Sequence, residues 1–144
     1  MTKKFLRGFT LIEILVTIVI LSILAGITIV ALNPGQNIDD ANDLRRKSDV
    51  VTIMNAISQY SVDNGGTFPG DVTATDQAIS NTAANICSVL VPTYLAELPV
   101  DPLTGSYSDC LSYSTGYLVK KDATDKRITV TATMSDGTAY AKSR

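Results

Sequence analysis

The sequence contains neither histidine nor tryptophan among its 144 residues. Without histidine, the chain lacks the commonest general base, most nucleophilic triads and nearly all catalytic zinc sites. It also contains no glycine-rich phosphate-binding pattern and no G-x-S-x-G motif. These absences predict a protein that is not an enzyme and that holds no cofactor and no catalytic metal.

Positive charge is sparse beyond the first eight residues. The chain carries 12 Lys and Arg against 14 Asp and Glu, and three of the basic residues are Lys3, Lys4 and Arg7. The remaining residues therefore hold nine basic and fourteen acidic side chains, a net charge of −5. A general nucleic-acid surface needs clustered positive charge. The sequence argues against such a surface, although a local basic patch could still bind DNA.

Arg45-Arg46-Lys47 is the one basic cluster of that part of the chain. Its simplest interpretation is a solvated helix face. The alternative is a contact with acidic groups such as Asp39, Asp40 or Asp43 of a neighbouring subunit. Asp43 and Lys47 are also spaced as an i,i+4 pair, which stabilises a helix by only a few tenths of a kcal/mol.

A long uncharged apolar run extends from Ile14 to Leu32, and Glu13 stands directly before it. As a helix, residues 9–32 would be roughly 35 Å long, enough to cross a hydrocarbon core about 30 Å thick. The basic residues before this helix are expected to stay on the cytoplasmic side. Glu13 is the anomaly, because a charge buried in a membrane helix costs roughly 2.5–3.5 kcal/mol and usually has a partner or a function.

The junction Arg7-Gly8, followed by Phe9-Thr10-Leu11-Ile12-Glu13, resembles the class III signal peptide of type IV pilins and pseudopilins. The resemblance implies that prepilin peptidase, a membrane-embedded aspartyl peptidase, cuts after Gly8 and methylates the new amine of Phe9. It also implies that Glu13 serves assembly, by attracting the N-terminal amine of a subunit already in the fibre. A signal anchor and a secretory signal peptide are the alternatives. The first leaves Glu13 unexplained, and the second would need a small-x-small cleavage site before a polar start.

The only two cysteines, Cys87 and Cys110, lie in the part that the leader would place outside the cytoplasm. That compartment is oxidising. A bridge between them would close a loop of about 24 residues and stabilise the fold by roughly 3 kcal/mol in the chain-entropy model. Two free cysteines are the alternative. Pilin-like heads often carry such a disulfide, and we predict one here.

A second helical pattern runs from about Asp39 to Asp63 and ends at Asn64-Gly65-Gly66. Its apolar residues share one helix face: Val50, Ile53, Met54, Ile57 and Tyr60. Leu32-Asn33-Pro34-Gly35 separates this helix from the apolar one, because proline disfavours helix at the residue before it. Pilins often melt within their first helix in the fibre, and the candidates here are Gly26 and the Asn33-Pro34-Gly35 cluster.

The rest of the chain is expected to form a head. A short helix is predicted between about Thr75 and Val91, with one apolar face: Ile79, Ala83, Ile86 and Leu90. Three strands are predicted after it, at Leu111–Lys120, Arg127–Met134 and near Thr138–Lys142. A polar turn at Asp122–Lys126 and a hairpin turn at Asp136-Gly137 would join them.

These elements predict an α+β, pilin-like fold, in which a long N-terminal helix packs against a small antiparallel sheet. We expect four segments along the chain. They are a leader at 1–8, a transmembrane and polymerisation helix at 9–32, a kink and amphipathic half of the long helix at 33–64, and a globular head at 65–144.

The resemblance favours a structural subunit of a type IV pilus. Such a subunit would sit in the cytoplasmic membrane by its single helix. An assembly platform and motor, with minor pilins as further partners, would polymerise it into an extracellular filament for adhesion, motility or DNA uptake. The alternative is a pseudopilin of a type II secretion or competence system, favoured by the phrase Leu98-Pro99-x-Asp101-Pro102. A membrane-anchored binding module is the third class, and it leaves Gly8-Phe9 and Glu13 unexplained.

Major secretion pseudopilins commonly hold calcium in a loop between strands, so the resemblance raises the question of oxygen ligands. Four aspartates could supply them: Asp101, Asp109, Asp122 and Asp125. Their spacing is not that of an EF-hand, and solvated aspartates are the preferred interpretation.

Overall fold

The computed structural model describes residues 8–70 and 72–144, without the side chains of residues 29–32. Of the predicted leader, only Gly8 is among the described residues. The chain forms two compact units, Met1–Ile38 and Asp39–Arg144. The second unit is the head, built from most of the second helix and all of the strands.

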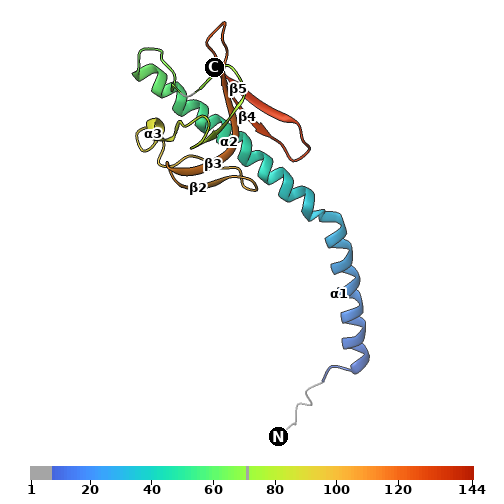
Figure 1. Ribbon diagram of the computed structural model, residues 1–144. Coiled ribbons are helices and arrows are strands. Elements are labelled where there is room, and N and C mark those ends of the chain that lie inside the picture. The colour runs from blue at the N-terminus through green and yellow to red at the C-terminus, as the bar shows by residue number, and fades with distance from the viewer. Residues whose placement is uncertain (1–7, 71) are drawn as a thin grey trace. The chain divides into compact units, whose positions relative to one another are not determined.

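The first helix, α1, spans Leu11–Leu32 (Figure 1). Thr10 caps its start, because the side-chain oxygen accepts a hydrogen bond of 3.3 Å from the backbone N–H of Glu13. Every described side chain of α1 is exposed. The hydroxyls of Thr17 and Ser22 donate to carbonyls of the preceding turn. They therefore add no unpaired polar group to the apolar surface of the helix.

Helical structure is interrupted at Asn33, which adopts the left-handed conformation with a φ of 36°. The next helix, α2, spans Pro34–Asp63. Pro34 suits the first position of a helix, where no N–H partner is needed. The break thus falls in the Asn33-Pro34-Gly35 cluster, but α2 begins earlier than the expected start at Asp39.

One face of α2 is buried in the head, and most of the residues of this face were predicted from the sequence. Val50, Ile53, Met54 and Ile57 are buried, and Tyr60 is half-buried. Beyond Asp63 the chain turns away through two glycines with positive φ, Gly65 and Gly66.

A five-stranded antiparallel sheet packs on α2 (Figure 1). Its strands are β1 (Gln77–Ser80), β2 (Ser106–Asp109), β3 (Ser112–Lys121), β4 (Ile128–Thr133) and β5 (Ala139–Ser143). The order across the sheet is β1-β3-β4-β5, and β2 pairs with the beginning of β3. The three predicted C-terminal strands are confirmed, and Gly137, with a φ of 82°, forms the turn between β4 and β5.

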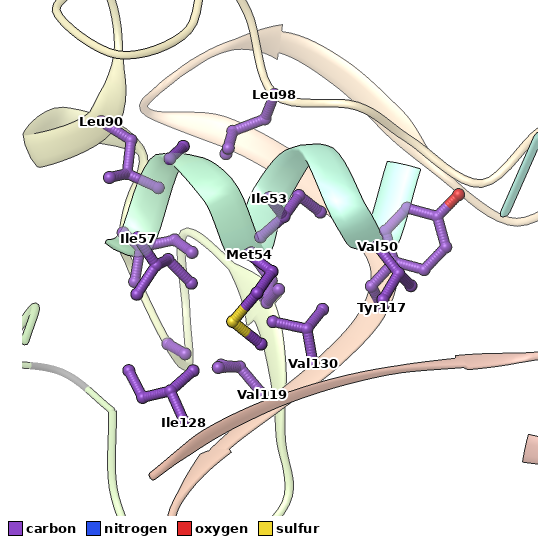
Figure 2. Close-up of a cluster of buried hydrophobic side chains, with 14 of the residues drawn as sticks. Val50, Ile53, Met54, Ile57, Leu90, Leu98, Tyr117, Val119, Ile128 and Val130 are labelled. Atoms are coloured by element: carbon purple, nitrogen blue, oxygen red, sulfur yellow. The ribbon is translucent and has the colours of Figure 1, made fainter. Parts of the chain in front are cut away.

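The core of the head lies between α2 and the sheet (Figure 2). Alternate residues of β3 and β4 are buried: Tyr113, Thr115, Tyr117, Val119, Ile128, Val130 and Ala132. In Figure 2, Val119 and Val130 face Met54 of α2, and Leu90 and Leu98 lie across the helix from them. Because each such side chain contributes roughly 1.5–3 kcal/mol when fully buried, this cluster is the main stabilising feature of the head.

The predicted helix between Thr75 and Val91 is wrong. Its beginning is the strand β1, and its end is the single turn α3 (Cys87–Leu90). Ile79 is buried as expected, but Ala83 is exposed. The segment is extended because it pairs with β3, which lies far away in the sequence, and local periodicity does not reveal such pairing.

Candidate functional site

The three residues predicted to serve processing and assembly lie together at the start of α1. Gly8 and Phe9 precede the helix, and the Phe9 side chain is 78% exposed. Glu13 stands in the first turn and is exposed. Gly8, Phe9, Thr10 and Glu13 line one surface hollow. A peptidase, or a second copy of the chain, could therefore reach all three residues at one place.

The helix that follows has the length and composition of a membrane span. Its segment Leu11–Thr28 has a mean hydropathy of 2.6 and none of its side chains is buried. Apolar side chains that stay exposed along the described helix need an apolar environment, because their exposure to water is unfavourable. A bilayer and a bundle of like helices both provide one.

Within the head, Arg46 is the residue that sequence analysis placed wrongly. It is only 5% exposed. Its Nε donates to Asp101 Oδ2 at 2.5 Å, and its Nη1 donates to Asp43 Oδ1 at 2.8 Å and to Ser135 Oγ at 3.0 Å. Arg46 is therefore neither part of a solvated helix face nor available to a neighbouring subunit. It joins α2 to the segment before β2 and to the turn between β4 and β5.

One sequence signal could have identified this buried arginine. Arg46 stands four residues before Val50 and seven before Ile53, so it continues the buried face of α2 by one more turn. A charge in that register is a candidate for a buried ion pair. Its partner could not have been named, because Asp101 is 55 residues away.

Asp101 is held from two directions. Arg46 binds one side of the carboxylate, and Oδ1 accepts hydrogen bonds from the backbone N–H groups of Leu103 at 2.9 Å and Thr104 at 2.8 Å. Burial by itself raises the pKa of Asp101, but the hydrogen bonds from Arg46, Leu103 and Thr104 outweigh it and lower the pKa to about 2. Asp101 is consequently ionised throughout the ordinary pH range.

The backbone around this carboxylate leaves no room for another side chain. Gly116 in β3 has a φ of 80°, and a Cβ built on it would lie 2.8 Å from Asp101 Cβ and 2.8 Å from Thr104 Oγ1. A side chain there would be strained by its conformation and would collide with Asp101 Cβ and with the Thr104 hydroxyl, which is bonded to the carboxylate. Gly116 is therefore what allows Asp101 to approach the sheet.

A second buried polar pair links α2 to β3. The fully buried Tyr117 donates its hydroxyl to Asp49 Oδ2 at 2.8 Å. Burial raises the pKa of Tyr117, and the carboxylate of Asp49 raises it further, so the phenol stays protonated and acts as the donor. Arg45 Nε lies 3.9 Å from the same carboxylate.

The predicted disulfide between Cys87 and Cys110 is present, with the two Cα atoms 5.3 Å apart. It joins α3 to the turn between β2 and β3. The backbone N–H of Cys87 also donates to the Tyr113 hydroxyl at 3.3 Å, which in turn donates to Asn85 at 2.9 Å. The bridge thus reinforces polar contacts between the same two parts of the head.

The four aspartates considered as calcium ligands do not form a site. Asp101 is neutralised by Arg46, so the interpretation of it as a solvated side chain is also wrong. Asp109 and Asp122 accept hydrogen bonds from N–H groups of their own turns, and Asp125 pairs with Arg127 at 3.1 Å. In residues 8–70 and 72–144, no three acidic or cysteine side chains are placed to hold a metal ion.

Comparisons with known proteins give a family-model match at the N-terminus and curated relatives over most of the chain. Residues 6–29 match the family model of the prokaryotic N-terminal methylation motif. The type II secretion system core protein G of Klebsiella michiganensis is 34% identical over 109 residues, which cover 74% of this chain and 75% of that protein. The protein of the same name from Aeromonas hydrophila is also 34% identical over 109 residues, 74% of each chain. No solved structure matches the chain significantly.

Proposed function

Because the chain belongs to the family of the type II secretion system core protein G, we propose that it is a pseudopilin that polymerises through its N-terminal helix in a secretion-type machinery. The observation that carries this proposal is the extent of the match. It covers 74% of the chain, whereas the methylation motif alone covers residues 6–29. The relatives thus favour the pseudopilin over the type IV pilus subunit that the sequence first suggested.

The proposed processing site is the bond between Gly8 and Phe9. Both residues are exposed and lie before the first helical turn, where an extended segment can enter a peptidase. Cleavage would give Phe9 a free amine, which methylation would then modify. The match of residues 6–29 to the methylation motif supports this order of events.

The proposed role of Glu13 is to pair with the N-terminal amine of another subunit. The side chain is exposed at the start of an apolar helix and lines the same hollow as Phe9. A carboxylate at this depth in a membrane needs a cationic partner. The amine of a neighbouring Phe9 would supply the opposite charge and fix the axial position of one subunit against the next.

The outer face of α2 supports polymerisation independently. Leu44, Val51 and Val62 are exposed, and their spacing of seven and eleven residues places them on one side of the helix, away from the core. Two exposed residues among them, Ser48 and Asn55, are uncharged, and the exposed Asp40 and Lys47 flank this apolar stripe. A helix that faces water normally carries charges opposite its core. We infer that a helix of a second copy covers this face in the fibre.

The processing and assembly roles can be tested in cells that express the full chain with its own peptidase. Gly8→Ala is expected to leave the uncleaved chain in the membrane. Glu13→Ala is expected to be cleaved normally, and to fail in filament formation, because the charge that attracts the N-terminal amine of a subunit already in the fibre is lost. Intact mass of the membrane fraction reports cleavage and methylation, and electron microscopy reports filaments.

Thr17→Ala is the matched control, because it removes another polar group one turn further along α1. It should be cleaved and should assemble. Normal filaments from the Glu13→Ala strain would contradict the charge-pairing role. A processed wild-type chain found chiefly in sheared surface filaments, and not in the membrane fraction, would favour the type IV pilus over the pseudopilus.

A further inference from the structure

We propose that Arg46 takes the place of a structural divalent cation in this head: its guanidinium is a built-in counter-ion that holds Asp43 and Asp101 together, so the head folds without calcium. The resemblance to major pseudopilins raised the question of a calcium site, and the described residues do not form one. The inference concerns the head alone and holds whichever filament the chain forms.

The first argument is connectivity. A structural cation binds together chain segments that apolar packing alone leaves free, and Arg46 does this for three segments. It contacts Asp43 within α2, Asp101 before β2 and Ser135 in the turn after β4. These partners are 3, 55 and 89 residues away in the sequence. Such long-range links are what a shared metal would otherwise provide.

The second argument is the state of the oxygen atoms. Calcium takes six to eight oxygen ligands. Around Asp101 the acceptors are already engaged: Oδ2 by Arg46, and Oδ1 by Leu103 and Thr104. Among the described residues, no buried side-chain oxygen or nitrogen is without a hydrogen-bond partner. Both oxygens of the carboxylate are thus already bonded to the guanidinium or to groups of the Asp101 turn, with Arg46 Nη2 also 3.4 Å from Oδ1.

The third argument is the space beside the arginine. Arg46 and Asp101 line an open cavity of about 400 Å³, together with Asp39 and Ser135. If the guanidinium were removed, Asp43 and Asp101 would lose their shared counter-ion beside this open cavity. Two carboxylates with water and a serine hydroxyl are ligands that calcium accepts. Truncation of Arg46 should therefore create a response to calcium that the natural chain lacks.

The experiment measures thermal unfolding of the full chain in detergent by near-ultraviolet circular dichroism. All six tyrosines lie between Asp39 and Arg144, and the chain has no tryptophan, so the tyrosine band of this spectrum reports the head alone. The wild-type midpoint is expected to be the same in excess EDTA and in calcium. Arg46→Ala should lower the midpoint in EDTA by roughly 10–20 °C, because a buried carboxylate loses its partner. Calcium should restore part of that loss, and magnesium should restore less.

Two variants serve as controls. Arg45→Ala removes the neighbouring arginine, whose side chain is 59% exposed. Its midpoint should equal that of wild type and should be the same in EDTA and in calcium. Arg46→Lys retains a cation and should unfold between wild type and Arg46→Ala, still without a calcium response.

Two results would overturn the proposal. One is a wild-type midpoint that falls in EDTA and is restored by calcium. The other is an Arg46→Ala midpoint that is the same in EDTA and in calcium. If Arg46→Ala does not fold, calorimetric titration of the wild-type chain decides the question: no calcium binding supports the proposal, and saturable binding to the head contradicts it.

Discussion

At the scale of single residues, Asp101 is both ionised and buried, a combination that proteins tolerate only when the partners are fixed. Its partners are a guanidinium from α2 and two N–H groups of its own turn. Removing one member of such a pair typically costs about 3–5 kcal/mol, because the remaining charge stays buried. Gly116 is part of the same arrangement, since a side chain there would collide with Asp101 Cβ and Thr104 Oγ1.

The pH dependence of stability follows from this residue. The folded pKa of Asp101 is about 2, below the value of 3.8 for an unperturbed aspartate. Its contribution is therefore complete above about pH 4 and is lost as the pH falls towards 2, a change of roughly 2 kcal/mol. We expect wild-type stability to fall more steeply across that window than the stability of Asp101→Asn, measured by urea unfolding of the tyrosine signal. Parallel pH curves would contradict an ionised Asp101 in the folded head.

At the scale of elements, local patterns predicted α2 and the strands β3 to β5, because their apolar residues alternate or recur within a few positions. β1 and α3 could not be predicted, since pairing with β3 decides the structure of that segment. The same limit applies to the site. The junction Gly8-Phe9 and Glu13 form a contiguous motif, whereas the Arg46–Asp101 pair joins distant parts of the chain.

The contribution of the disulfide to the link between elements can be tested directly. Cys87 and Cys110 are 23 residues apart, and the bridge attaches α3 to the β2–β3 turn. We expect the double change Cys87→Ser and Cys110→Ser to lower the free energy of unfolding by roughly 2–4 kcal/mol, because the unfolded chain gains freedom. Guanidinium unfolding measures this difference. Reduced wild type is the matching control and should behave like the double variant. Equal midpoints for the oxidised and reduced wild type would show that the bridge adds no stability.

At the scale of the whole molecule, the outer face of α2 is the surface through which we propose that separate copies pack. Val51 lies at the middle of that face and is 37% exposed. Val51→Glu is expected to leave the melting midpoint of the head unchanged and to reduce filament number strongly, because a charge would enter the apolar centre of the proposed helix contact.

Leu111→Glu provides the matched control for Val51→Glu. It places the same charge on another exposed apolar residue, 84% exposed in the turn between β2 and β3, away from α2. Electron microscopy of both strains, with processing checked by mass, measures the difference. Filaments as numerous with Val51→Glu as with Leu111→Glu would show that no subunit covers this face.

The Arg46 network also has a mechanical consequence. Apolar packing has no preferred direction, so a helix held by it alone can slide along a sheet under load. Hydrogen bonds to a guanidinium are directional, so even a small shift of a partner lengthens them and is resisted. Force applied along α2 is therefore passed through Arg46 to the segment before β2 and to the β4–β5 turn. A fibre pushed from its base would move each head with its helix, without slippage between the two.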